Sequence, residues 1–300
     1  MFYEEDFIIL GFIFVSCSTV KDIALMGIEV AQITGTIDSK TAQTLSSSTE
    51  SISKLVEKIT PENEYYIGRS TAAMLVDKYS IYNNEKLNKY LNNICGAITS
   101  CSSKPYLYKG YFVAVLNSDE INAMATPGGH IFVTRGMLKC VSSEDELASV
   151  IAHEVAHIQL QHGLSVIKSS RFTDATLDIT KFAVVKYGSD DFDKFVDLFD
   201  DSVNDIVSTL VNNGFSQSQE FDADEYALTL LNDSGYNPHS FKKVLEKIKL
   251  NQVDSSSGFV KTHPDPDKRI NKIVKLLDEN ISKNDEKNRY DRFEVVSKYF

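Results

Sequence analysis

The chain has 300 residues, of which 42% are hydrophobic and 10% aromatic, so it is long and apolar enough to fold around a packed core. This composition excludes a largely disordered protein. The 42 acidic residues exceed the 31 basic ones and give a formal net charge of -11 at pH 7, which argues against nucleic acid as a partner.

The segment 1–17 is similar to a bacterial lipoprotein signal. The apolar run at 7–15 is too short to span a bilayer as a helix and suits the apolar part of a secretory signal. The string FVSC then places Ser16 before Cys17, as in a lipobox, where the cysteine receives the lipid. The segment departs from that pattern because Phe14 replaces the usual leucine and no Lys or Arg precedes the apolar run. An ordinary apolar strand or helix is the alternative.

The next segment, 18–59, is rich in Ser and Thr with scattered apolar residues, and we expect a tether that is partly helical. Thr60 followed by Pro61 predicts the cap and first turn of a helix that reaches about Tyr79. A further helix is expected over 85–99, where apolar residues recur at helical spacing.

The pattern then changes from helical to strand-like. The aromatic and β-branched residues of 105–117 predict one strand, and the alternation in 130–136 predicts another after the turn TPGG. Between them the segment INAMA, residues 121–125, is short enough to be an edge strand.

Helices are expected over the rest of the chain. Ser143 and Glu146 form a capping-box pattern at the start of a helix that should run to about His162 or beyond. The remaining helical patterns cover 171–213, 216–235, 240–251 and 266–277, and a charged, loose tail is expected at 281–300. Many helices with few strands indicate an α+β domain with one small sheet.

The cysteines give no sign of a thiolate zinc site, because no Cys-x-x-Cys spacing occurs. Cys95 and Cys101 are close enough in sequence to form a disulfide in an oxidising compartment, which would leave Cys140 unpaired.

The segment ELASVIAHEVAHIQLQHG, residues 146–163, carries the pattern that points to chemistry. His153 and His157 share one face of the predicted helix, with Glu154 between them. Imidazoles at this spacing ligate zinc in metallopeptidases, where the intervening glutamate contacts the water that zinc activates. A pair of hydrogen-bonded core histidines is the alternative.

Two imidazoles leave a catalytic zinc short of one protein ligand. One class of enzyme takes a third histidine six residues after the second, but Gly163 stands there. His162 lies about 900° round the helix from His153, so we expect it to point to the opposite side. Another class takes a glutamate from a separate helix. Glu220 is the best candidate, because Asp224 follows at i+4 and can accept the free N–H of a ligating histidine. A solvated acidic face is the alternative for both.

The chain resembles the family of zinc metallopeptidases that includes the CAAX prenyl proteases, HtpX, BepA and LoiP. The matching segments, in order, are TPENEYYIGR (60–69), NAMATPGGHIFVTRGML (122–138), SEDELASVIAHEVAHIQLQHG (143–163), EFDADEYA (220–227), GYNP (235–238) and THPDPDKRI (262–270). The resemblance covers about residues 60–280. Without long transmembrane spans or a helical-repeat domain, the chain is most similar to the soluble, LoiP-like lipoprotein branch.

The resemblance implies a zincin-like (gluzincin) fold, mostly helical, in which the edge strand of a small sheet flanks the active site. It implies one Zn²⁺ per chain. The residues that the resemblance assigns are the zinc ligands His153, His157 and Glu220, the general base Glu154, the ligand-orienting Asp224, the oxyanion or gating residues His263 and Arg269, and the substrate-binding edge Asn122, Ala123, Met124 and Ala125.

The expected organisation is a signal at 1–17, a tether at 18–59, the peptidase domain at 60–280 and the tail at 281–300. The resemblance implies a zinc endopeptidase that degrades misfolded or unassembled envelope proteins, held on a bacterial outer membrane by a lipid on Cys17. A zinc-stabilised chaperone or a latent enzyme is the rival interpretation. An unrelated helical lipoprotein, with a chance motif and no zinc, is another.

Overall fold

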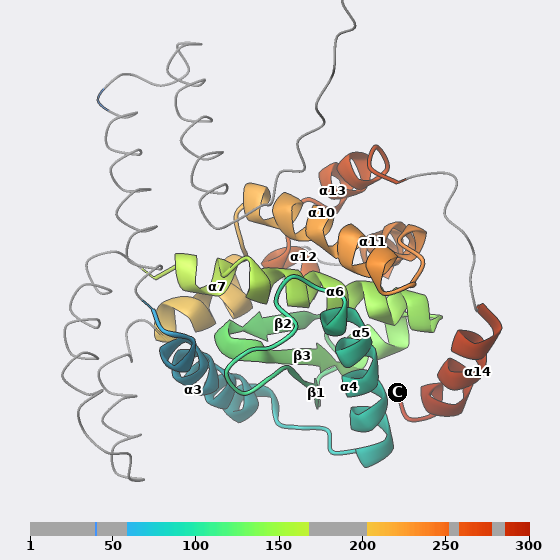
Figure 1. Cartoon of the computed structure of the whole chain (residues 1–300), viewed down its shortest axis with the longest axis horizontal. Coiled ribbons are helices and arrows are strands. Elements are labelled where there is room, and N and C mark those ends of the chain that lie inside the picture. The colour runs from blue at the N-terminus through green and yellow to red at the C-terminus, as the bar shows by residue number, and fades with distance from the viewer. Residues whose placement is uncertain (1–39, 41–58, 168–202, 252–257, 278–285) are drawn as a thin grey trace, which may run out of the picture. The chain divides into compact units, whose positions relative to one another are not determined.

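The computed structural model describes residue 40 and residues 59–167, 203–251, 258–277 and 286–300 (Figure 1). The chain divides into two compact units, Met1–Leu55 and Val56–Phe300, and the following description concerns the second. Two expected segments lie outside the described residues: the lipid signal with Cys17 and most of the tether. Of the helix expected over 171–213, only 203–213 is described, and it is helical.

The first helices of this unit begin where the sequence predicts. Helix α3 (Pro61–Tyr79) is capped by Thr60, whose side chain accepts a hydrogen bond from the Asn63 N–H. Its first residue is Pro61, and proline suits this position because the N–H that it lacks would have no partner within the helix. Helix α4 (Glu85–Ser100) is capped in the same way by Asn84.

Three strands form one small mixed sheet in the order β1-β3-β2. Strand β1 (Phe112–Leu116) pairs parallel with β3 (His130–Thr134), and β2 (Ala123–Thr126) pairs antiparallel with β3. The turn between β2 and β3 is the short helix η1 (Pro127–Gly129), in which both glycines have positive φ. The expected edge position of the INAMA segment is therefore confirmed, whereas the first strand is shorter than predicted.

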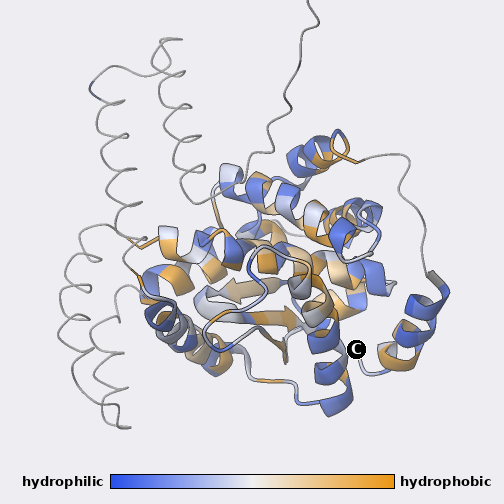
Figure 2. Ribbon diagram, in the orientation of Figure 1, coloured by the Kyte–Doolittle hydropathy of each residue, from blue (hydrophilic) through white to orange (hydrophobic). Residues whose placement is uncertain are grey.

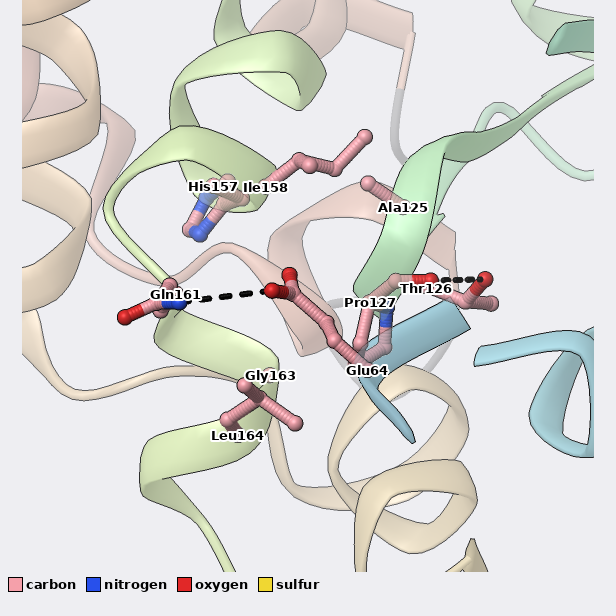
Figure 3. A pocket seen from close by; sticks show the side chains of 9 residues that line it. All are labelled: Glu64, Ala125, Thr126, Pro127, His157, Ile158, Gln161, Gly163 and Leu164. Carbon is pink, nitrogen blue, oxygen red and sulfur yellow. Dashed lines mark hydrogen bonds between the residues drawn. The ribbon is translucent and has the colours of Figure 1, made fainter. Parts of the chain in front are cut away.

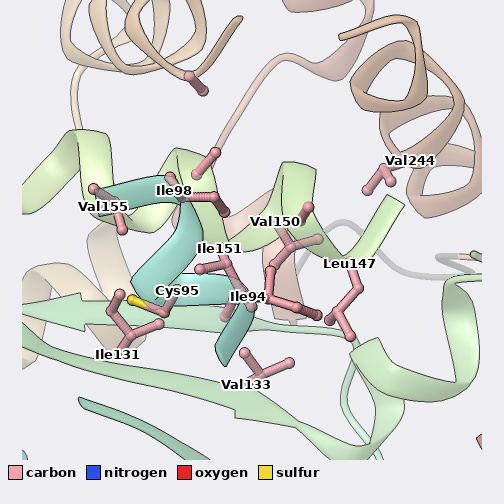
Figure 4. Packing of buried hydrophobic residues seen from close by; sticks show 14 of the residues in the cluster. Ile94, Cys95, Ile98, Ile131, Val133, Leu147, Val150, Ile151, Val155 and Val244 are labelled. Carbon is pink, nitrogen blue, oxygen red and sulfur yellow. The ribbon is translucent and has the colours of Figure 1, made fainter. Parts of the chain in front are cut away.

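Helix α6 (Glu144–Gln159) is the centre of the packing. Every one of its residues is buried, because the sheet and α4 cover one side and the later helices α10 (Gln217–Asp233) and α11 (His239–Asn251) cover the other (Figure 1). Figure 4 shows its apolar side chains between Ile94 of α4, Val133 of β3 and Val244 of α11. Two short helices, α5 (Arg135–Cys140) and α7 (His162–Ser165), flank it.

The remaining elements are η2 (Thr209–Asn213), α12 (Gly258–Thr262), α13 (Pro266–Ile273) and α14 (Glu286–Ser297). Figure 2 shows hydrophilic and hydrophobic residues together on α11 and α13, as expected for helices that pack one face on the core. The architecture confirms the α+β class with a small sheet. Among the described helices, none is both long and apolar enough to cross a membrane.

The expectation of a loose tail is wrong for the described part of it. In α14, Arg289 Nε lies 2.9 Å from Asp145 Oδ2 and Arg292 Nε lies 2.9 Å from Glu144 Oε2. Phe293 of α14 is also buried. The acidic first turn of α6 is buried and needs charged partners, which the tail supplies.

The disulfide expected between Cys95 and Cys101 is not formed, and both thiols are free. Cys95 faces the core from α4, and burial raises its pKa to about 12, whereas Cys101 is exposed at the end of the same helix. Residues six apart on one helix lie on different faces, too far apart to bridge.

Candidate metal centre

Helices α6 and α10 bring together the two histidines and the glutamate that the sequence suggested. His153 Nε2 and His157 Nε2 are 3.0 Å apart on α6. Glu220 of α10 places Oε2 3.5 Å from His153 Nε2 and Oε1 3.4 Å from His157 Nε2. The fully buried Ala223 and Ala227 on α10 allow this close approach, because small side chains let helix backbones come near each other.

His263 joins this group from the turn after α12. Its Nδ1 lies 3.0 Å from Glu220 Oε1 and 3.3 Å from His153 Nε2. One ligand atom from each of His153, His157, Glu220 and His263 lies within 4.8 Å of the others, and all four side chains are buried. The structure therefore places His263 beside the three expected ligands, as a fourth side chain within reach of the same space.

The residues fit a zinc ion. Imidazole nitrogen and carboxylate oxygen are ligands that zinc takes in peptidase sites. Both carboxylate oxygens of Glu154 are buried and have no hydrogen-bond partner among the described residues. His263 Nε2 lies 3.7 Å from Glu154 Oε1, beyond hydrogen-bond distance. A buried carboxylate without a hydrogen bond is costly, so the arrangement is explained if a cation and a water molecule share this space. His153, His157 and Glu220 would hold the ion.

Behind the ligands lies a buried charge network. Asp224 Oδ1 is 3.1 Å from His153 Nδ1, the position expected of a ligand-orienting residue. Arg269 of α13 donates to Asp224 through Nε at 2.9 Å, and its Nη1 lies 2.9 Å from Glu220 Oε2. The oxyanion role of Arg269 stays a prediction, because its guanidinium contacts these carboxylates in this structure.

Burial and charge set the protonation of the centre. Burial raises the pKa of Glu154 and lowers the pKa of His157 well below its usual value, which keeps His157 in the neutral form that binds metals. Burial also tends to raise the pKa of Glu220, but the nearby His263 and Arg269 outweigh it and hold that pKa well below the usual range.

The predicted substrate-binding edge lies beside this centre but is covered. Ala123, Met124 and Ala125 are buried, as is Asn122, whose Oδ1 accepts from the Thr262 hydroxyl of α12 at 3.2 Å. His263 Nε2 lies 3.4 Å from the Ala123 carbonyl oxygen. His263 therefore contacts both the edge strand and Glu220 of the candidate ligand group.

The expectation for His162 is wrong. The residue is buried, with Nδ1 2.9 Å from Nδ1 of His157. Extrapolation of the helix fails because α6 ends at Gln159 and Gln161 is left-handed, with φ 58°, so the chain turns back before α7. The turn carries no glycine or proline at this position, which is the usual sequence signal for such a break.

Glu64 of α3 is a further residue to which sequence reasoning gave no role, although it lies in the quoted segment TPENEYYIGR. Its carboxylate accepts from the Gly128 N–H and from the Gln161 side-chain amide, both at 3.3 Å. Figure 3 shows Glu64 and Gln161 in a narrow pocket that His157 also lines. Glu64 therefore joins the turn after β2 to the turn after α6.

The chain is similar in sequence to several proteins that are named as proteases. A fission yeast protein, mitochondrial metalloendopeptidase OMA1 of Schizosaccharomyces pombe, is 31% identical over 55% of this chain and 46% of its own length. Metalloprotease LoiP of Escherichia coli is 28% identical over 60% of this chain and 67% of its own length. The beta-barrel assembly-enhancing protease of the same bacterium is 24% identical over 63% of this chain and 39% of its own length. The chain spans less than half the length of the first and third of these relatives.

The model of peptidase family M48 matches residues 84–277, which include the histidine pair on α6, Glu220 on α10 and His263. This match covers more than half of the chain, and the buried nitrogen and oxygen donors fit the zinc that metallopeptidases of this family use. The chain belongs to peptidase family M48.

Proposed function

We propose that the chain is a zinc-dependent endopeptidase. The observation that carries this proposal is the convergence of His153, His157 and Glu220 beside Glu154, whose carboxylate has no hydrogen-bond partner among the described residues. A site with three protein ligands and a neighbouring general base is the arrangement of catalytic zinc, whereas structural zinc sites take four protein ligands.

The chain's own residues have distinct tasks in this reaction. When bound, zinc polarises the peptide carbonyl and lowers the pKa of water toward about 7. Glu154 accepts a proton from the attacking water at a carboxylate oxygen and passes it to the departing amine. Asp224 accepts the Nδ1–H of His153 and keeps its Nε2 free as a ligand. His263, within reach of the Ala123 carbonyl, is placed to donate to the oxyanion.

An unfolded or misassembled polypeptide is the proposed substrate. Strand β2 is an edge strand of the sheet, and an extended peptide would pair with its backbone once the side chains that cover it move away. Such pairing uses main-chain groups and demands little of the substrate sequence. One relative is named a beta-barrel assembly-enhancing protease, and that name supports a proposed role in protein quality control in the bacterial envelope. We place the chain there, with Cys17 as its lipid-anchor site.

The test is the substitution Glu154→Gln, with Glu225→Gln, an exposed glutamate of α10, as the matched control. The E154Q protein should bind zinc like the wild type and cleave casein no faster than a blank, because the amide cannot accept the proton. The E225Q protein should retain cleavage. Casein cleavage by purified E154Q at the wild-type rate would remove Glu154 from the mechanism.

A latent form of this enzyme is the second candidate, and a specific observation favours it. The three candidate ligands and His263 are at most 2% exposed, and His263 contacts the Ala123 carbonyl that a peptide would need. If His263 blocks the site, His263→Ala should raise casein cleavage. If His263 donates to the oxyanion, the same variant should lower it. A chaperone that never cuts predicts no cleavage by either protein, with suppression of aggregation that a chelator removes.

A further inference from the structure

Each of the two histidines on α6 has a partner on the ring nitrogen that faces away from the candidate ligand group. For His153 that partner is the Asp224 carboxylate, 3.1 Å from Nδ1. For His157 it is another imidazole, His162, whose Nδ1 lies 2.9 Å from Nδ1 of His157. His162 is 4% exposed, so no bulk water competes for this contact.

The turn that delivers His162 is held from outside α6. Gln161 adopts φ 58° and donates from its side-chain amide to Glu64 Oε2 on α3. Gly163 packs against η1, where a Cβ atom would lie 3.1 Å from Pro127 Cγ. Glu64 and Pro127 therefore fix the left-handed turn that returns His162 toward His157. This contact gives a structural role to the segment 60–69, which contains Glu64.

The contact between the two rings permits only one useful arrangement of protons. His157 Nε2 faces His153 and Glu220, so it must present a lone pair if the group is to hold a cation. A neutral imidazole then carries its proton on Nδ1, and that N–H needs an acceptor. His162 Nδ1 is the atom at hydrogen-bond distance, and it accepts when the proton of His162 is on its own Nε2.

We propose that His162 is a positioning residue for the metal centre: it accepts the Nδ1–H of His157 and fixes the tautomer that presents Nε2 to zinc. The inference rests on the zinc site of the proposed function. The two ligating histidines would then have different acceptors for their Nδ1–H groups: a carboxylate for His153 and a neutral imidazole for His157. Phe215, stacked on His157 with ring centroids 4.3 Å apart, supports the ring without supplying an acceptor.

The first experiment compares His162→Leu with His162→Asn in the full chain. Leucine fills the space without an acceptor, whereas the asparagine Oδ1 can stand close to the place of Nδ1. Zinc affinity is measured by competition with a chromophoric chelator. H162L should bind zinc about 10–100-fold more weakly than the wild type, the loss typical of an orienting partner, and H162N should bind close to the wild-type affinity.

His130→Leu is the matched control, since His130 packs against Tyr65 and Phe112 outside the candidate ligand group. H130L should keep the wild-type zinc affinity. Equal zinc affinity of H162L and wild type would overturn the proposal, as would an H162N protein that binds as weakly as H162L. A wild-type chain that binds no zinc would instead overturn the metal site, and this inference with it.

A second measurement reads the proton directly and does not depend on the folding of H162L. The zinc-loaded wild type is labelled with ¹⁵N-histidine, and long-range ¹H–¹⁵N spectra report the tautomer of each of its six histidines. The His162 signals are identified by their absence from H162N. His162 should show a bare Nδ1 and a protonated Nε2. A protonated Nδ1 would show that the bond runs the other way and would overturn the proposal.

Discussion

Among the described residues, Arg269 has the largest fully buried side chain, and its guanidinium lies between two carboxylates. It pairs with Asp224 and Glu220 at distances of 2.6–2.9 Å, with no exposed surface. The value of such a pair lies mainly in the partners that it neutralises, because a buried carboxylate without a counter-charge is strongly unfavourable.

Replacing Arg269 should therefore cost far more stability than replacing a surface cation. We expect Arg269→Met to lower the free energy of unfolding of the zinc-free protein by about 3–5 kcal/mol, since two buried carboxylates lose their partner. Urea denaturation measures it. The control is Lys139→Ala, which removes an ion pair to Asp119 between side chains that are 48% and 81% exposed, and should cost about 0–1 kcal/mol. Equal losses would contradict the buried-network account.

Glu64 gives a pH-dependent prediction. Burial raises its pKa in the folded protein, while its hydrogen bonds from Gly128 and Gln161 lower it by less. A carboxyl whose pKa is raised by folding is protonated more readily in the native state, so it adds stability as the pH falls through the folded-state pKa. That gain is complete below the unfolded value, near 4.5.

The variant Glu64→Gln should lose this contribution, because its amide does not titrate. The difference in unfolding free energy between the wild type and E64Q should shift in favour of the wild type as the pH falls toward 4.5, because only the wild type gains stability on protonation. Urea denaturation at a series of pH values checks it. A difference that stays constant with pH would show that Glu64 has no raised pKa.

At the scale of elements, the contact between α3 and η1 positions the edge strand. A Cβ atom on Gly68 of α3 would lie 1.6 Å from the Pro127 carbonyl oxygen, so the helix and the turn touch through this glycine. Gly96 in α4 has no atom near its Cβ position. The two helical glycines thus differ in their surroundings alone, which makes them a matched pair.

Alanine at these positions should have opposite effects. We expect Gly68→Ala to destabilise the protein by at least about 1–3 kcal/mol, because the backbone of α3 or η1 must move. We expect Gly96→Ala to stabilise it by about 0.5–1 kcal/mol, the usual gain for alanine over glycine within a helix. Chemical denaturation measures both. A harmless G68A would show that α3 and η1 are not in firm contact.

For the whole molecule, the metal would join elements that are far apart in sequence. The three candidate ligands come from α6 and α10, with His263 beside them on the turn after α12, and none of these elements alone can hold the ion. A ligand that binds only the folded state stabilises it in proportion to the logarithm of its concentration over Kd.

Zinc should accordingly raise the unfolding temperature, and a chelator should lower it. At free zinc about 1,000 times Kd the gain corresponds to about 4 kcal/mol. Calorimetry with and without chelator measures it. Glu220→Ala should abolish the zinc-dependent shift, whereas Glu225→Ala, on the exposed side of α10, should retain it. A shift that survives in E220A would exclude Glu220 as a ligand.

Local patterns were sufficient for much of the fold and for part of the site. Residue propensity and helical pitch act over a few residues. They are sufficient to predict the cap at Thr60, the helices before and after the sheet in the chain, and the shared face of His153 and His157. The disulfide between Cys95 and Cys101 failed because sequence proximity says nothing of which helix face a thiol occupies.

The sequence by itself determined the family, the helix that carries the histidine pair and the glutamate segment that joins it, because these depend on short-range spacing and on recognisable motifs. Only the tertiary structure decided that His263 joins the group, that His162 returns to His157 and that the tail neutralises the start of α6. These contacts link residues through turns and packing of distant elements, and a left-handed turn at a glutamine leaves no local signal from which the direction of the following side chain can be predicted.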